Sequence, residues 1–215
     1  MSLSKKKIYI FGCTMWDIVG KPLEPISKGK DCSGFINERP GGVAFNVAIG
    51  LSKILNRRSF ELNLVSAIGK NEKTSVIRTV LEQNNINTKY LLIKGNQNDQ
   101  YLSIETKNGE IFGSINSSTT FLSSQSAILK YFSKICLEHK NENSNAIFIF
   151  DGNCSRKFLD FVKKEGKPRS LLLKWSLCVK RHYSINCLPD QRSIKCLKQS
   201  EKLLRERCSL KTLRC

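Results

Sequence analysis

The chain has 215 residues and a formal net charge of +18, from 36 lysines and arginines against 18 aspartates and glutamates. This length suffices for one domain with a sizeable core, and no stretch approaches the roughly 20 apolar residues that a membrane-spanning helix requires. The basic first residues precede only a short apolar run that Asp17 ends, which argues against a signal peptide and predicts a cytoplasmic protein with reduced cysteines.

Strand and helix patterns alternate from the start of the chain. An apolar strand is predicted at Lys7–Gly12, whereas prolines and glycines restrict residues 18–35 to short extended pieces. Apolar residues at three-and-four spacing then predict a helix over Ala44–Leu55. A buried strand at Leu62–Gly69 and a helix at Glu72–Gln83 follow.

The next part of the chain continues the alternation and adds a hairpin. Two strands, a helix and a buried strand are predicted at Lys89–Lys94, Gln100–Thr106, Ser123–His139 and Ala146–Gly152. Asn108–Gly109 is typical of a two-residue β-hairpin turn. Ser155 is a favourable N-cap for a final helix that Gly166 ends.

This alternation predicts an α/β fold, in which a mostly parallel sheet is covered by helices on both faces. The hairpin and the broken segment near residues 18–36 do not fit that layer and indicate a small antiparallel β appendage. Ligands of such sheets bind at the carboxyl ends of the strands. Asp17 follows the first strand and the pair Gly41–Gly42 opens the next helix, so we expect both to face one crevice.

The glycine pair and its neighbours have two interpretations. Gly41 and Gly42 allow positive φ and close approach of a ligand to the backbone, and Asn46 offers a donor and an acceptor for hydroxyl groups. The alternative, which spacing alone favours, is a tight turn before a core helix with Asn46 bonded to neighbouring backbone. Asp17 and Asp151 each follow a buried strand, and each is either a holder of polyol hydroxyls or an ordinary loop or capping aspartate.

Several segments together are similar to one family. IYIFGCTMWDIVG, PGGVAFNVAIGLSKI, LVSAIGKN and NINTKYLLI resemble the N-terminal half of the PfkB family of carbohydrate kinases, which have the ribokinase-like fold. QYLSIETKNGEIFGSIN and AIFIFDGNCS look most similar to the pseudouridine kinase branch. The resemblance covers about residues 7–168.

The resemblance implies a three-layer α/β/α sandwich with a small β lid that often forms homodimers. It implies ATP-dependent phosphorylation, with Mg²⁺, of a hydroxyl on a small-molecule sugar or nucleoside. Apart from the resemblance, the lack of a membrane-spanning stretch argues against a membrane partner, and the sparse aromatic residues of the C-terminal tail argue against a nucleic-acid partner. By this match Asp17, Gly41, Gly42 and Asn46 hold the ribose-like hydroxyls, and Asn116 contacts the substrate from the lid.

The chain departs from the family pattern at two places that matter for function. Asn71 and Thr74 stand where the family pattern G-x-D-x-x-G has an aspartate and a glycine, which puts the local turn geometry in question. The motif D-T-x-G-A-G-D, which in the family supplies the catalytic base and the ATP cradle, does not occur in the chain. We therefore name no catalytic residue and no metal ligand, and expect ATP and Mg²⁺ to belong to the family rather than to this chain.

The sequence changes character near residue 168. Residues 169–215 hold 12 of the 36 basic residues and five of the nine cysteines, without a glycine and without a C-x-x-C pair that would suggest zinc. We expect a kinase domain over 1–168, with lid pieces at about 18–36 and 98–116, that is truncated there and leaves an unpaired sheet edge, and then a basic Cys-rich tail.

Three origins of the tail stay open: a reading-frame change near codon 168, alternative splicing, and a genuine or disordered extension. In a shifted frame LLLKWSLC is compatible with V-E-[M/V]-V-S-V, which is similar to the next strand of the family. The alternative function is a non-catalytic nucleic-acid-binding or regulatory protein, in which the basic tail with Trp175 and Tyr183 contacts phosphates and bases.

Overall fold

The computed structural model describes residues 5–142, 146–165 and 171–174, the last four by their backbone. Its elements are β1 (Lys6–Phe11), β2 (Met15–Pro22), β3 (Gly34–Gly41), α1 (Val43–Ile54), β4 (Phe60–Ile68), α2 (Glu72–Gln83), β5 (Ile86–Asn87), β6 (Leu91–Ile93), β7 (Asp99–Glu105), β8 (Ile111–Ser117), α3 (Thr119–Asn141), β9 (Ala146–Phe150), α4 (Arg156–Glu165) and β10 (Leu171–Lys174). No helix within these ranges combines the length and the apolar character that crossing a membrane requires.

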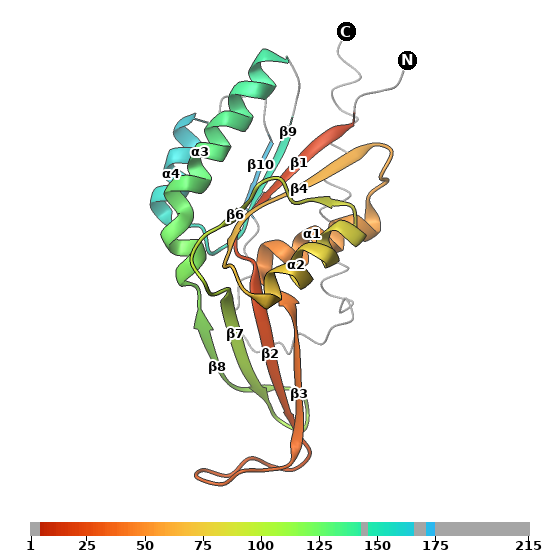
Figure 1. Cartoon of the computed structure of the whole chain (residues 1–215), viewed down its shortest axis with the longest axis vertical. Helices are drawn as coiled ribbons and strands as arrows, with labels where there is room; N and C mark the ends of the chain where they lie inside the picture. Colours follow the sequence, from red (N-terminus) through yellow and green to blue (C-terminus); the bar gives the residue numbers. More distant parts are fainter. Residues whose placement is uncertain (1–4, 143–145, 166–170, 175–215) are drawn as a thin grey trace. The chain divides into compact units, whose positions relative to one another are not determined.

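The main sheet has the strand order β10-β9-β1-β4-β5, and β6 also pairs with β4. Every one of these pairs is parallel. Figure 1 shows α1 and α2 on one face of the sheet and α3 and α4 on the other. The predicted α/β fold with helices on both faces is therefore confirmed.

The core between the sheet and α3 is largely aromatic. Because side chains alternate along a strand, Tyr9 and Phe11 of β1 face this side together with Phe148 and Phe150 of β9. Tyr9 stacks on Phe148 at 5.6 Å between ring centroids, Phe11 stacks on Phe150 at 5.0 Å, and Phe132 of α3 meets Phe148 edge-on at 5.3 Å. This packing fixes β1, and with it the chain that leaves its carboxyl end.

A second, smaller sheet has the order β3-β2-β7-β8, and we call it the small sheet (Figure 1). The expectation of an antiparallel appendage is wrong in one respect, because β2 and β7 run parallel while the β2–β3 and β7–β8 pairs are antiparallel. The reason is that β2 and β7 both continue from the carboxyl edge of the main sheet and so run in the same direction.

The strands of the small sheet are longer than the expected short pieces. Gly20 and Pro22 lie on β2, and Pro22 pairs with Gly34, the first residue of β3, so only Pro25 and Gly29 fall in the loop between the strands. Pro40 lies on β3, an edge strand, where a missing backbone N–H is tolerated.

The hairpin between β7 and β8 forms, but with a longer turn than predicted. Thr106 N–H donates to the carbonyl of Glu110 over 2.6 Å, which leaves three residues in the loop. Asn108 has no positive φ, whereas Gly109 has φ +80°. Only one position of the loop needs the left-handed conformation, so a three-residue loop ending in glycine replaces the predicted two-residue turn.

One short strand follows residue 168, so the unpaired edge is not at β9. Leu171–Lys174 pairs in parallel with Ile147–Phe150, so β9 is not the edge of the sheet. The backbone N–H and C=O groups along one side of β9 can form hydrogen bonds with an extended segment that follows α4. The predicted helix stop at Gly166 and the tail from Trp175 onward, with its nucleic-acid-binding alternative, lie outside the described residues.

Helix α3 begins four residues before the predicted start, and its cap comes from a distant strand. Ser118 at the N-cap position makes no side-chain capping bond. Instead the carboxylate of Asp99, only 1% exposed, accepts hydrogen bonds from the backbone N–H groups of Thr120 (2.7 Å) and Phe121 (2.8 Å). Asp99 opens β7, so this cap joins the start of α3 to the base of the small sheet.

Replacing Asp99 by alanine is expected to lower the free energy of unfolding by about 2 kcal/mol, because two buried N–H groups at a helix start lose their acceptor. Asp99→Asn keeps one acceptor oxygen and should lose less. Urea denaturation measures both. The control is Asp160→Ala, which removes an exposed ion pair with Arg156 on α4 and should cost below about 0.5 kcal/mol. A loss for Asp99→Ala no larger than for this control would contradict the capping role.

Candidate functional site

The candidate site lies where the small sheet joins the main sheet. The chain leaves β1, crosses over Gly12–Thr14 and enters β2, while β3 returns beside β2 and leads into α1. Three buried carboxylates belong to this junction: Asp17, Asp99 and Asp151. Their surroundings differ, and the difference indicates which of them is available to a ligand.

The glycine pair shapes the site in two ways. A Cβ on Gly41 would overlap the carboxylate of Asp17, so the absence of a side chain makes room for that group. Gly42 has φ +90°, and a Cβ there would lie 2.5 Å from the carbonyl oxygen of Cys13. Gly42 is also the N-cap of α1, and its carbonyl accepts from Asn46 N–H at 2.9 Å. Both glycines are therefore required by close contacts, and both line the start of a helix.

Asp17 is buried, and its carboxylate has no hydrogen-bond partner among the residues that the structure describes. Its side chain is 6% exposed, and no hydrogen bond to its carboxylate is found in the part of the chain that the structure describes. Burial raises the pKa of Asp17 to about 6, and the positive charge of Arg39 on β3 partly offsets this effect. A desolvated carboxylate without donors is costly in a folded protein, so it is suited to accept hydrogen bonds from a ligand.

Asp151 is satisfied within the protein. Its carboxylate accepts hydrogen bonds from the backbone N–H of Cys13 (2.6 Å) and of Asn153 (2.7 Å), and it fills the space that a Cβ on Gly12 would need. Burial raises the pKa of Asp151, and these N–H donors oppose the rise. Of the two interpretations of Asp151, the geometry favours the capping one, since the residue ties the ends of β9 and β1 together.

A row of polar side chains crosses the small sheet through Asp17. In the strand register Arg39 lies opposite Asp17, Asp17 opposite Tyr101, and Tyr101 opposite Asn116. Opposite residues share one face of a sheet, so all four belong to the same face. Asn116 is exposed and lies two strands from Asp17, a separation of about 10 Å. Arg39 and Tyr101 were missed from the sequence because only the register aligns them with Asp17.

Asn46 lies on the first turn of α1 and is exposed. The alternative that its side chain bonds to neighbouring backbone is not found within the described ranges. Asn46 thus stays accessible on the helix that the glycine pair opens.

Asn71 and Thr74 rebuild a helix start at the place where the chain departs from the family pattern. Asn71 is the N-cap of α2, and its side-chain oxygen accepts from Lys73 N–H at 3.1 Å. In return the hydroxyl oxygen of Thr74 accepts from Asn71 N–H at 3.1 Å. This reciprocal capping box satisfies two donors, so these two residues form a well-capped helix start.

The described residues contain no cluster of three or more histidine, cysteine, aspartate or glutamate side chains that is arranged to hold a metal ion. Cys13, next to Asp99 and Asp151, is not a nucleophile at neutral pH, because burial and these carboxylates raise the pKa of its thiol well above the ordinary range. The polar groups near Asp17 are therefore the guanidinium of Arg39, the phenol of Tyr101, the amides of Asn46 and Asn116, and the backbone of the glycine pair.

Comparisons with known proteins agree with this architecture. The sequence model for the pfkB family carbohydrate kinase matches residues 5–147. The fold is similar to a ribokinase from Giardia lamblia (TM-score 0.65, 15% identity, 82% of this chain and 52% of that one). It is also similar to a ribokinase from Thermotoga maritima (TM-score 0.60, 17% identity, 78% of this chain and 51% of that one). A nucleoside kinase from Methanocaldococcus jannaschii is similar as well (TM-score 0.54, 16% identity, 80% of this chain and 53% of that one).

The chain thus spans about half the length of these solved structures. A search of curated proteins finds no match.

Because Asp17 is buried, we predict that removing its charge raises the free energy of unfolding by an amount that depends on pH. The pKa of Asp17 is about 6 in the folded chain against an ordinary 3.8, so above about pH 6 the folded state bears the cost of a buried charge, and below about pH 4 this cost vanishes. We expect Asp17→Asn to raise the free energy of unfolding by up to about 3 kcal/mol at about pH 8 and by almost nothing at about pH 4.

Chemical denaturation of both proteins across this pH range measures the difference. The matched control is Asp31→Asn, the same chemical change at an exposed position, which should stay within about 0.5 kcal/mol at every pH. A difference between Asp17→Asn and the parent that does not vary with pH would contradict the burial of an ionisable Asp17.

Proposed function

Because this chain belongs to the pfkB family of carbohydrate kinases, we propose that it forms the substrate-binding half of a sugar or nucleoside kinase. Asp17, Gly41, Gly42 and Asn46 hold the hydroxyl groups of the substrate, and Asn116 contacts it from the small sheet. The cytoplasm, where its cysteines stay reduced, is the proposed location.

One observation carries this proposal: Asp17 is buried and has no hydrogen-bond partner in the described part of the chain, whereas Asp99 and Asp151 are satisfied by backbone N–H groups. A carboxylate accepts strong hydrogen bonds from two adjacent hydroxyls, which is the arrangement that a sugar presents. Gly41 leaves room for this carboxylate, and the exposed Asn46 adds a donor and an acceptor at the mouth of α1.

The polar row supports a nucleoside as the substrate, and the sequence resemblance to the pseudouridine kinase branch extends the proposal to pseudouridine. A ligand whose hydroxyls bind Asp17 must extend about 10 Å to reach Asn116, which a nucleoside does and a free pentose does not. Tyr101 lies between the two positions and offers an aromatic ring on which a base can stack. The amide of Asn116 then pairs with the edge of the base.

We further propose that this chain holds its substrate without phosphorylating it. Bound ATP and Mg²⁺ would supply the phosphoryl group and stabilise its charge during transfer. The sequence lacks D-T-x-G-A-G-D, and the described residues offer no cluster of metal ligands, so they do not fit an ATP or Mg²⁺ site. The residues present therefore orient a hydroxyl but do not activate it.

Isothermal titration of the full chain with pseudouridine, uridine and ribose tests the proposal. We expect a nucleoside to bind more tightly than ribose, and Asp17→Asn to weaken binding at least about tenfold, because charged hydrogen bonds are lost. The exposed control Asp31→Asn should leave the affinity unchanged. Equal affinities for the parent and Asp17→Asn would contradict the role of Asp17, and ADP formation from ATP with any of these ligands would contradict the proposed inactivity.

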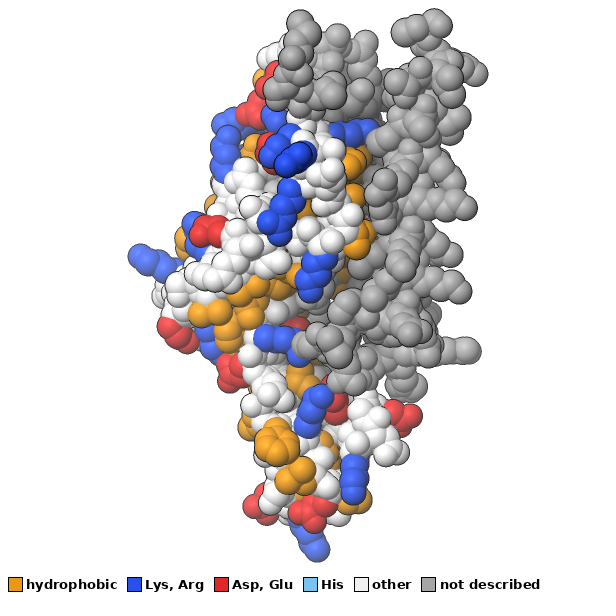
Figure 2. All heavy atoms as spheres, turned by 90° about the vertical axis from the view of Figure 1, so that its right-hand side faces the viewer, with side chains coloured by type: hydrophobic (Ala, Val, Ile, Leu, Met, Phe, Trp, Pro, Cys, Tyr) orange, Lys and Arg blue, Asp and Glu red, His pale blue; other side chains and the backbone are white. Residues whose placement is uncertain are grey.

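The opposite face of the small sheet supports a second proposal, a homodimer through this sheet. In the register Ile36 shares a row with Ile104, and Leu102 shares one with Ile115, all on the face away from Asp17. Ile36 is 76% exposed and Ile115 66% exposed. Figure 2 shows hydrophobic side chains exposed among charged side chains of both signs toward the end at which Figure 1 places the small sheet. A second copy would bury the same patch on both chains.

Ile115→Lys should convert a dimer into a monomer, because a lysine placed in an apolar interface leaves an unpaired charge. Sedimentation velocity measures the mass. Leu137→Lys makes the same change at a 58% exposed leucine of α3 and should leave the dimer intact. A parent chain that sediments as a monomer at all concentrations would refute the proposed dimer.

A further inference from the structure

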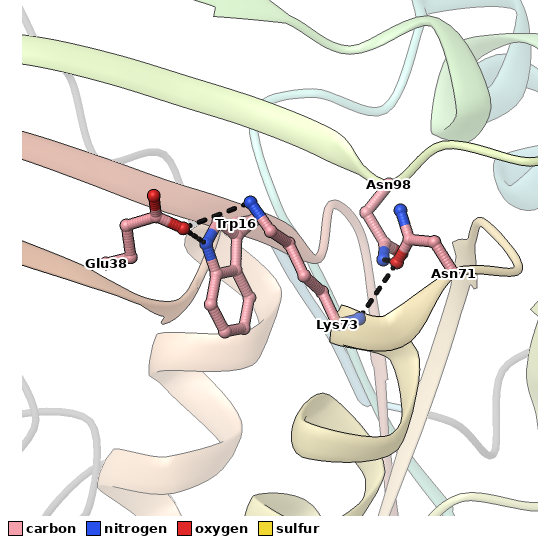
Figure 3. Close-up of polar contacts among 5 residues, drawn as sticks. All are labelled: Trp16, Glu38, Asn71, Lys73 and Asn98. Atoms are coloured by element: carbon pink, nitrogen blue, oxygen red, sulfur yellow. Dashed lines mark hydrogen bonds and ion pairs between the residues drawn. The ribbon is translucent and has the colours of Figure 1, made fainter.

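Trp16, Glu38 and Lys73 form a compact cluster on the face of the small sheet opposite Asp17 (Figure 3). One carboxylate oxygen of Glu38 accepts from the indole N–H of Trp16 at 2.6 Å and from the Lys73 ammonium at 3.0 Å. The same ammonium lies 5.1 Å from the centre of the Trp16 ring. Each of the three side chains thus contacts both of the others.

The cluster joins two parts of the fold. Trp16 and Glu38 belong to β2 and β3, whereas Lys73 belongs to the first turn of α2, which packs on the main sheet. These contacts add to the covalent connections at the junction and link the pair β2–β3 directly to a helix of the main layer.

The backbone at Lys73 is held in place by hydrogen bonds. Its backbone N–H donates to the side-chain oxygen of Asn71, which also accepts from the Asn98 amide at 2.6 Å (Figure 3). Asn98 in turn accepts from Gly69 N–H at 2.8 Å and is 4% exposed. The start of α2 is therefore fixed to the segment that leads into β7, and Lys73 does not need to order a mobile backbone to reach Glu38.

The residues of the cluster and those of the candidate site occupy neighbouring positions on the same two strands, β2 and β3. Trp16 precedes Asp17 on β2, and Glu38 precedes Arg39 on β3, so each pair of neighbours points to opposite faces. A rotation of β2–β3 that moves Glu38 away from α2 must also move Asp17, since eight register pairs join the two strands.

We infer that Trp16, Glu38 and Lys73 act as a latch that holds β2–β3 against α2 and so positions Asp17 and Gly41 at the substrate site. The effect of the latch on substrate binding rests on the proposed function, whereas the latch itself involves only residues of this chain. The positioning residues touch no substrate and act through the orientation of Asp17.

The latch is weak enough to be opened. The side chains of Lys73 and Glu38 are 21% and 44% exposed, so solvent and salt screen their charges. The shared indole donor and the cation–π contact add to this ion pair, and we expect their combined loss to change the ratio of open to closed chains by about tenfold.

The test uses the full chain with Trp175→Phe, which leaves Trp16 as its single tryptophan. Lys73→Met should shift the Trp16 emission to the red and increase its quenching by acrylamide about twofold or more, because the indole loses its cover. In the same variant the pKa of Asp17, followed by carbon-detected NMR of its carboxyl group, should move from about 6 toward the ordinary 3.8, because water reaches the group.

Two matched variants separate the latch from a general loss of stability. Lys73→Arg keeps the cation and should retain both signals of the parent. Lys53→Met removes a lysine from the last turn of the neighbouring α1 and should change neither. Far-UV circular dichroism reports folding, and if Lys73→Met does not fold, the unsubstituted latch is opened instead with about 0.5 M NaCl, where a red shift of Trp16 is again expected.

An Asp17 titration that stays at about 6 while the Trp16 emission shifts would overturn the positioning role, and an emission unchanged by Lys73→Met or by salt would overturn the latch itself. Neither readout includes a substrate. A failure of the latch is therefore distinct from a failure of the proposed function, which would show only as absent or Asp17-independent ligand binding.

Discussion

The arrangement of the junction depends on one contact, the Asp17 carboxylate against the backbone of Gly41. The carboxylate occupies the volume that a side chain at Gly41 would fill, so β2 and β3 can approach only with glycine at this position. The close approach buries Asp17, and the turn at Gly42, with its positive φ, then directs the chain into α1. The burial of Asp17, the start of α1 and the pairing of β2 with β3 therefore form a single constraint. It leaves the Asp17 carboxylate without a hydrogen-bond donor among the described residues.

The two strands that carry this contact serve different purposes on their two faces. One face carries the row from Arg39 through Asp17 to Asn116, and the other carries Trp16 and Glu38 and then the exposed isoleucines. Because successive side chains alternate, a change in the tilt of the strands affects both faces at once. The proposed substrate site, latch and dimer surface are thus coupled by the geometry of a β-strand rather than by a chain of side-chain contacts.

Much of the fold follows from local pattern, and the departures have long-range causes. The main-layer strands and α1 and α2 lie within a few residues of their predicted bounds, since apolar periodicity is a local property. The early start of α3 was missed because its capping group, Asp99, is some twenty residues away. The parallel β2–β7 pair and the added strand Leu171–Lys174 depend on which strands become neighbours, which no local window contains.

The sequence by itself determined that Asp17, the pair Gly41–Gly42 and Asn46 stand at the ends of elements where ligands bind, and that the chain resembles one kinase family. Only the tertiary structure decided which carboxylate is available. Asp17 and Asp151 each follow a buried strand and look alike in sequence, but Asp151 is satisfied by backbone N–H groups while no donor in the described residues reaches Asp17. Hydrogen-bond satisfaction depends on residues brought together by folding, and this is why pattern alone could not separate them.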